Sequence, residues 1–209
     1  MRLFPRCHRI LGILGVVLAS ALLPLAAFAT EYQIDTGHSS VNFKVRHLVS
    51  KTTGKFDKFT GTIDHTPGKP DTWKVVAHID AASIDTNEPK RDKHLRSTDF
   101  FDTDKFKELT FESTGVKDAN DKTANVEGKL TIHGVTKPVI LAVEMGGEGT
   151  DPWGNHSIGF TATTKLNRKD YGLTWNKALE AGGFLVGDDI EIVLEIEAHA
   201  AAPAKKAKK

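Results

Sequence analysis

The feature that most constrains the fold of this chain is a two-residue alternation of apolar and polar side chains between residues 32 and 199. In SVNFKVRH (40–47), Val41, Phe43 and Val45 face one way, while the polar residues between them face the other. This is the pattern of a β-strand with one dry face and one wet face. It recurs in TWKVVAHID (72–80), LTFES (109–113), VEGKLTIHG (126–134), VILAVEM (139–145), SIGFTATTKL (157–166) and DIEIVLEIEA (189–198).

Segments rich in glycine, proline, asparagine and aspartate separate these runs, as turns between strands require. Examples are TPGKPDT (66–72), KDANDKT (117–123) and GGEGTDPWGN (146–155). With KFTGTID (58–64) included, we count about eight strands, and the short loops favour antiparallel neighbours. Eight such strands either stack as a sandwich or close into a barrel, and periodicity alone does not choose. A barrel of this size is filled by side chains or holds one small ligand.

The N-terminal segment 1–29 has the three parts of a secretory signal peptide: basic residues, an apolar run, and the small-residue signal Ala-Phe-Ala at 27–29. The apolar run is short for a membrane span and no charged stop follows it. We therefore expect cleavage after Ala29 and export. The single cysteine, Cys7, is removed with this segment, so the mature chain has neither a thiol nucleophile nor a thiolate metal ligand.

Charge argues against nucleic acid as a partner. Cleavage removes three arginines and leaves 25 basic against 27 acidic residues, and residues 30–199 alone carry a net charge of −6. An acidic body lacks the basic surface that nucleic-acid binding needs. The tail 200–209 contains four lysines and no apolar pattern, so we expect it to be disordered. Such a tail could touch an anionic lipid surface at about 1 kcal/mol per lysine.

Two segments, 86–101 and 167–189, break the alternation and carry aromatic residues beside charged ones. Loops of this length within a compact domain are usually lids or binding loops. In the first segment, Asn87 is a suitable helix cap and Pro89 suits the first helical turn. The sequence predicts a short helix over 88–97, held against the strands by Phe100 and Phe101, because an isolated helix of that length is marginal in water.

The same segment was considered as a catalytic or metal centre. Ser97 and His94 are three residues apart on the expected helix and could meet, but no G-x-S-x-G motif is present. The alternative is that Arg91 and Asp92 pin the helix to the strands. The mature chain has eight histidines, and no two are spaced for a shared helical face or lie two apart on a strand. The sequence therefore predicts no catalytic residue and no metal site, although ligands from distant strands stay possible.

Several separated motifs resemble the YceI-like family of periplasmic polyisoprenoid-binding proteins over residues 32–198 or so. They are YQIDTGHSSVNFKVRHL, GKFDKFTGTI, AASIDTNEPKRDKHLRSTDFFD, GKLTIHGVTKPV and GFTATTKLNRKDYGL. The resemblance implies an all-β fold, a lipocalin-like eight-stranded antiparallel β-barrel with a short helical cover. It also implies a long apolar ligand, a polyisoprenoid or an isoprenoid quinone, in the central cavity. Lys107 departs from the proline that the family often has before the next strand.

On this resemblance, residues 30–199 form one lipid-binding domain whose inward-facing side chains line the cavity. The candidate cavity-lining residues are Val41, Phe43, Val45, Trp73, Ile79, Phe100, Phe101, Phe111, Leu130, Ile132, Leu141, Phe160, Ala162 and Leu194. Specificity for a head group comes from a few polar residues at the mouth of such a pocket. The candidates for that role are Arg91, His94, Asn176 and Lys177.

The expected function is therefore a periplasmic binding protein that transports or stores this lipid. We expect no other cofactor, no nucleic acid and no catalysis. Transient membrane contact and a homodimer are both compatible with this expectation. Two alternatives stay open at the level of sequence: a secreted enzyme that uses His94 or Asp92 as acid or base on an apolar substrate, and a module whose interior is filled by its own side chains.

Overall fold

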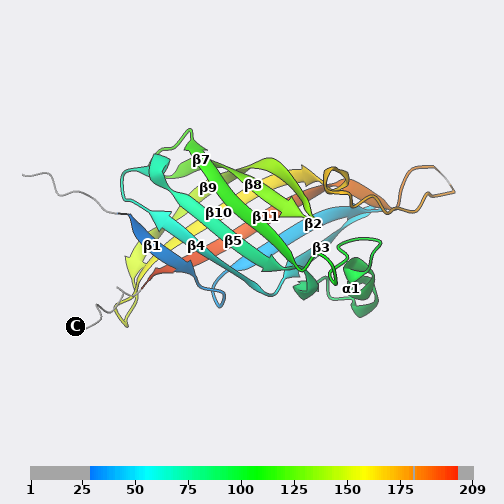
Figure 1. Ribbon diagram of the computed structural model, residues 1–209, viewed down its shortest axis with the longest axis horizontal. Coiled ribbons are helices and arrows are strands. Elements are labelled where there is room, and N and C mark those ends of the chain that lie inside the picture. The colour runs from blue at the N-terminus through cyan, green and yellow to red at the C-terminus, as the bar shows by residue number, and fades with distance from the viewer. Residues whose placement is uncertain (1–28, 181, 202–209) are drawn as a thin grey trace, which may run out of the picture.

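The computed structural model describes residues 29–180 and 182–201 (Figure 1). The predicted signal peptide up to residue 28 and the predicted tail from residue 202 lie outside this part of the chain. The described residues form one α-helix, α1 (Pro89–Arg96), and short 3-10 helices η1 (Pro70–Thr72), η2 (Ala81–Ser83) and η3 (Arg168–Tyr171). The strands are β1 (Thr30–Ile34), β2 (Ser40–His47), β3 (Ser50–Phe56), β4 (Phe59–His65), β5 (Lys74–Asp80), β6 (Ile84–Asp85), β7 (Glu108–Lys117), β8 (Thr123–Ile132), β9 (Val135–Thr150), β10 (His156–Asn167) and β11 (Val186–Ala200).

These strands form one antiparallel sheet that closes on itself. Its order is β1-β4-β5-β7-β8-β9-β10-β11, and β1 pairs with β11 to complete the ring. The long strand β11 also pairs with β2, so β1 and β2 lie end to end beside it with an interruption at 35–39. In the same way β3 continues into β4, and β5 continues through η2 into β6. The predicted eight-stranded barrel is therefore confirmed, and the sandwich is excluded.

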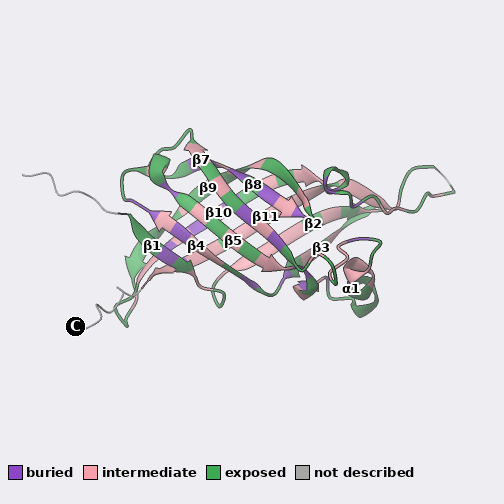
Figure 2. Cartoon of the chain, in the orientation of Figure 1, coloured by how far each residue is buried: buried purple, intermediate pink, exposed green. Residues whose placement is uncertain are grey.

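The inside of the barrel is the dry face that the alternation predicted. Burial alternates along the strands: on β5 intermediate residues alternate with exposed ones, and on β8 buried residues alternate with intermediate or exposed ones (Figure 2). Val76 and Ile140, which the alternation places on the outer face, are exposed. Two clusters of buried apolar residues lie on the inside of the barrel. The first includes Phe111, Leu130 and Ile132; the second surrounds Trp73 and Phe160.

Some local predictions were wrong. The strand β3 was not predicted, because six of its seven residues are polar or glycine and only Phe56 shows the pattern. Residues 146–150, read as part of a turn, belong to β9, which continues beside β10 through a register shift at Gly159. The hairpin turn between β8 and β9 is only two residues long, and both His133 and Gly134 have positive φ angles, as a tight type I′ turn requires.

The helix α1 lies at one end of the barrel, and η1 lies at the other (Figure 1). The N-cap of α1 is Glu88, whose side chain accepts a hydrogen bond from the backbone N–H of Lys90. The prediction that Asn87 caps this helix was wrong. Asn87 instead has a φ angle of 60°, a left-handed conformation that asparagine tolerates better than most residues. Among the described residues, we find no helix with the length and hydropathy of a transmembrane segment.

Candidate functional site

The inward-facing side chains leave a cavity inside the barrel. Its volume is about 240 Å³, counted as the space open to the centre of a water molecule. All eight strand positions of the ring contribute to its wall, which is almost wholly apolar. The wall includes Trp73, beside η1, and Leu95 of α1, so the cavity runs along the barrel from one end to the other. A dry cavity of this kind takes apolar guests and disfavours water.

All fourteen residues predicted to line a cavity do so. That they contact a ligand stays a prediction. Glycine makes room for two of these side chains: a Cβ atom at Gly54 would collide with the ring of Phe43, and one at Gly128 would collide with the ring of Phe111. The rings of Phe43 and Phe111 can therefore take these positions in the cavity wall because glycine lies next to each of them.

Sequence reasoning missed several other wall residues. They are Ile34, Phe56, Phe59, Ile63, Ile84, Leu95, Tyr171, Leu173 and Val186. Most lie in short or interrupted strands or in the 167–189 segment, where too few residues follow the alternation to reveal which side faces inward.

At the η1 end, aromatic rings form the wall. Trp73 packs against Phe160 with ring centroids 5.8 Å apart, and His65 lies 5.2 Å from Trp73. Tyr32 also contacts His65, and its hydroxyl is 3.0 Å from Nδ1 of His156. Burial lowers the pKa of His65, because a buried imidazolium is poorly solvated. The lowered pKa favours the uncharged form of His65.

At the other end, α1 and the residues after it cover the barrel. Leu95, Phe100 and Phe101 all reach the cavity, and Phe101 packs edge-on against Phe56 at 5.9 Å. The helix is fastened by its charged side chains: the Thr86 N–H donates to buried Asp92, and Nη2 of Arg91 donates to the carbonyl of Thr86 at 2.8 Å. The segment 86–101 is thus a cover, and Arg91 and Asp92 hold its helix to Thr86, the residue that follows β6.

The four predicted head-group residues do not line the cavity. Arg91 is bonded to Thr86. Asn176 donates to the carbonyl of Val186 and accepts from its N–H. Lys177 is exposed. His94 packs between Phe100 and Trp175, with its Nε2 atom 2.9 Å from Asp99. Their role in recognising a head group at the mouth stays a prediction.

Arg168 is a buried cation that the sequence did not single out. It is only 3% exposed, and its guanidinium donates to the backbone carbonyls of Gly187, Leu173 and Trp175 as well as to Asp188 at 3.1 Å. Burial lowers the pKa of Arg168, and the Asp188 carboxylate opposes that shift. Through these carbonyls, Arg168 holds residues 173–175 against the barrel, and Leu173 lies in the cavity wall.

The Ser97–His94 contact considered from the sequence does not form a catalytic pair. The Ser97 hydroxyl donates to the backbone carbonyl of His94 at 2.7 Å, while the His94 ring faces Asp99. A nucleophile needs a basic side chain within reach of its proton, and His94 is not placed to supply it.

An eight-stranded antiparallel barrel around an apolar cavity defines a lipocalin-like barrel protein. The chain belongs to the family described as the YceI-like domain, whose model matches residues 32–198. It is 44% identical over 165 residues to a UPF0312 protein of Vibrio cholerae serotype O1, covering 77% of this chain and 87% of that protein.

Two solved structures share the fold. BcnA of Burkholderia cenocepacia superposes with a TM-score of 0.70 at 23% identity, covering 78% of this chain and 98% of that one. A polyisoprenoid binding domain from Saccharophagus degradans superposes with a TM-score of 0.61 at 17% identity, covering 81% and 98% of the two chains. At these identities the similarity establishes the barrel architecture.

Proposed function

We propose that this protein holds a long apolar lipid, a polyisoprenoid or an isoprenoid quinone, in its barrel cavity for transport or storage in the periplasm. The observation that carries the proposal is the apolar cavity that runs the length of the barrel. The fold neighbour from Saccharophagus degradans is described as a polyisoprenoid binding domain, which supports the same ligand class here. The secretory pattern of residues 1–29 supports the location.

The size of the cavity fits a hydrocarbon chain. The apolar space of about 240 Å³ is much larger than a single water-sized group requires, so it can take a stretch of hydrocarbon chain. A methylene group is similar in size to water, and a longer polyprenyl chain would have to widen the cavity or extend past the cover. For a stretch of about twenty methylene groups, transfer from water would yield about 16 kcal/mol, near the practical ceiling of about 20 kcal/mol for non-covalent binding.

The relevant starting state is a membrane, where the chain is already dry. Most of that free energy cancels on transfer from a bilayer to the barrel, so the exchange is close to neutral. A near-neutral exchange suits a protein that must both load and release its ligand.

Filling the cavity tests the proposal. Ala162 is buried on the cavity wall in β10, and Ala162→Trp places an indole in the space that a lipid would occupy. We expect protein purified from the periplasm to yield lipid on organic extraction and mass spectrometry, and the variant to yield at least about tenfold less, because a guest displaced by an indole loses its own burial.

The matched control is Thr163→Trp, one residue along the same strand on the exposed outer face. It should retain lipid as the unmodified protein does. Equal lipid in the unmodified protein and Ala162→Trp would show that the lipid is not held in the cavity beside Ala162, and no lipid in either would contradict the proposal.

Exchange with a membrane requires a surface that contacts lipid, and we assign it to the barrel end nearest α1. Leu48 and Val49 form the exposed turn between β2 and β3, and Val49 is 95% exposed. The N–H of Leu48 donates to the carbonyl of Leu185 at 2.8 Å, which brings the turn beside the exposed ring of Phe184. Val45 of β2 and Val186 of β11 both line the cavity. Val45 pairs with Ile190, and Val186 pairs with His47. The exposed apolar tip formed by Leu48, Val49 and Phe184 therefore adjoins the lipid site.

Val49→Asp should reduce binding to lipid vesicles by at least about tenfold, because burying a valine side chain is worth roughly 1.5 kcal/mol or more. Co-flotation with vesicles of mixed neutral and anionic lipid measures the bound fraction. The control is Trp153→Ser. Trp153 is 85% exposed in the β9–β10 turn. This turn lies near the end of β11 that pairs with β1, where Ser157 pairs with His199. If Trp153→Ser lost vesicle binding and Val49→Asp did not, the membrane contact would lie at the opposite end of the barrel.

A further inference from the structure

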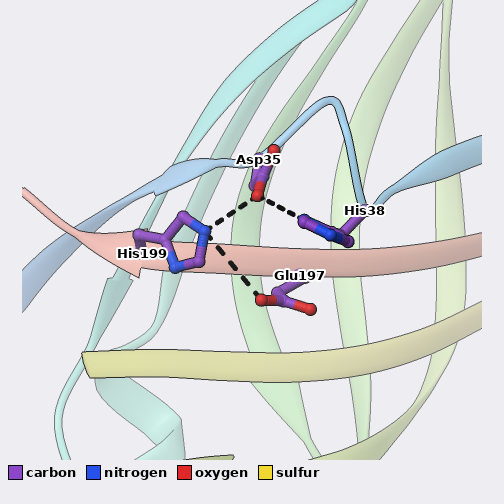
Figure 3. Close-up of side chains that lie close together, drawn as sticks. All are labelled: Asp35, His38, Glu197 and His199. Atoms are coloured by element: carbon purple, nitrogen blue, oxygen red, sulfur yellow. Dashed lines mark hydrogen bonds and ion pairs between the residues drawn. The ribbon is translucent and has the colours of Figure 1, made fainter. Parts of the chain in front are cut away.

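A cluster of metal-binding side chains lies on the outer face of the barrel, at the interruption between β1 and β2 (Figure 3). The four residues of this cluster are Asp35, His38, Glu197 and His199. The first two belong to the 35–39 interruption, and the other two lie two apart on β11, so their side chains share the outer face of that strand. Ala198 between them is fully buried inside.

The atoms that could bind a metal converge on one point. One atom from each of the four residues lies within 4.8 Å of all the others. Oδ2 of Asp35 is 2.8 Å from Nδ1 of His38 and 2.8 Å from Nε2 of His199. Oε1 of Glu197 is 3.9 Å from Nε2 of His199. Two imidazole nitrogens and two carboxylate oxygens are a donor set that suits zinc, whereas calcium and magnesium prefer oxygen alone.

The atoms that do not face this point are held by other partners. The backbone N–H of Gly37 donates to Oδ1 of Asp35 at 2.8 Å, which leaves Oδ2 toward the cluster. The hydroxyl of Ser157 is 2.8 Å from Nδ1 of His199, which leaves Nε2 toward it. Such supporting bonds orient the ligands of protein metal sites and fix the histidine tautomer.

The backbone around the cluster is also fixed. The N–H of Asp35 donates to the carbonyl of Glu197 at 2.9 Å, and the hydroxyl of Ser39 donates to the same carbonyl at 3.1 Å. The N–H of Glu197 donates to Ser39 in turn, at 2.9 Å. The interruption is therefore bonded to β11 before any ion arrives, and little ordering remains for a metal to impose.

We propose that this four-residue cluster binds one divalent transition-metal ion, with zinc as the ion of choice. Charge supports the assignment, because two carboxylates and two neutral imidazoles balance a dication. The ion would add a further link between the 35–39 interruption and β11, at the place where the barrel closes. His38 is largely exposed, so a water molecule can complete the coordination and the ion can exchange with solution. The site lies outside the lipid cavity and does not depend on the lipid-binding proposal.

Titration of zinc chloride into the mature protein, made without a polyhistidine tag and stripped with chelator, tests the site calorimetrically. We expect one zinc ion per chain, and His38→Ala should weaken binding by at least about tenfold, since loss of even a supporting partner of a metal ligand costs that much. His38 is exposed, so this variant should keep its fold. The control is His78→Ala, because His78 is also exposed beside a carboxylate, Glu108, at 3.3 Å; it should leave zinc binding unchanged.

A second variant and a second ion keep the test independent of folding. Glu197→Gln keeps the size of the side chain and removes its charge, and it should also weaken zinc binding. Cobalt(II) bound at the cluster should give visible absorption bands that are lost in both variants. Absence of saturable zinc binding by the unmodified protein, or equal zinc affinity and equal cobalt spectra in the unmodified protein and both variants, would overturn the proposal.

Discussion

Phe160→Arg is expected to lower the free energy of unfolding by at least about 4 kcal/mol. The fraction of this variant that still folds should contain no lipid. Phe160 is buried on the cavity wall, 5.8 Å from Trp73 and 6.4 Å from His65 between ring centroids. Loss of a buried phenylalanine alone costs about 3–5 kcal/mol. The guanidinium adds a desolvation cost, because the wall around it offers no carboxylate.

Urea denaturation of the delipidated protein measures the change in free energy of unfolding, and extraction measures the lipid. The matched control is Thr161→Arg, the next residue on β10, whose hydroxyl donates to Glu195 on the outer face at 2.7 Å. An arginine there can pair with Glu195 at the surface, so the change should stay below about 1 kcal/mol. Phe160→Arg with unchanged stability and unchanged lipid content would contradict the inward orientation of this residue.

Arg168→Met should lower the free energy of unfolding by about 3–5 kcal/mol. The substitution removes the donor for three backbone carbonyls, on Leu173, Trp175 and Gly187, and each carbonyl left buried without a partner costs about 1–3 kcal/mol. We also expect faster amide hydrogen exchange around residues 173–175, because Arg168 bonds to the carbonyls of Leu173 and Trp175.

Lys169→Met is the control for this prediction. Lys169 contacts the same Asp188 at 2.8 Å but is exposed to solvent, and an exposed ion pair is worth about 1 kcal/mol or less. If the two variants unfolded at the same urea concentration, the backbone contacts of Arg168 would not be what stabilises this end of the barrel.

The strands and their inward-facing residues could be predicted from the sequence because both depend on local alternation. Each long strand places its apolar residues on one side, so residues such as Phe111 and Leu194 could be assigned to the wall without knowledge of their partners. The closing of the sheet could not be predicted in this way. It rests on the pairing of β1 with β11, and those strands are more than 150 residues apart in the chain.

The polar sites were less predictable for the same reason. Arg91 and His94 were assigned to a mouth because of their charge and their place in a loop, yet their side chains bond to neighbours in the same segment. The Asp35 and His199 side chains meet across about 160 residues, and no spacing rule for metal ligands spans such a distance.

The central claim is that the inward side chains leave an apolar cavity that a lipid occupies. A crystal structure of the mature protein, purified from the periplasm without delipidation, tests it most directly. We predict continuous elongated density inside the barrel, running from Trp73 toward Phe100 and matching a hydrocarbon chain. An interior closed by the protein's own side chains, with no such density, would contradict it.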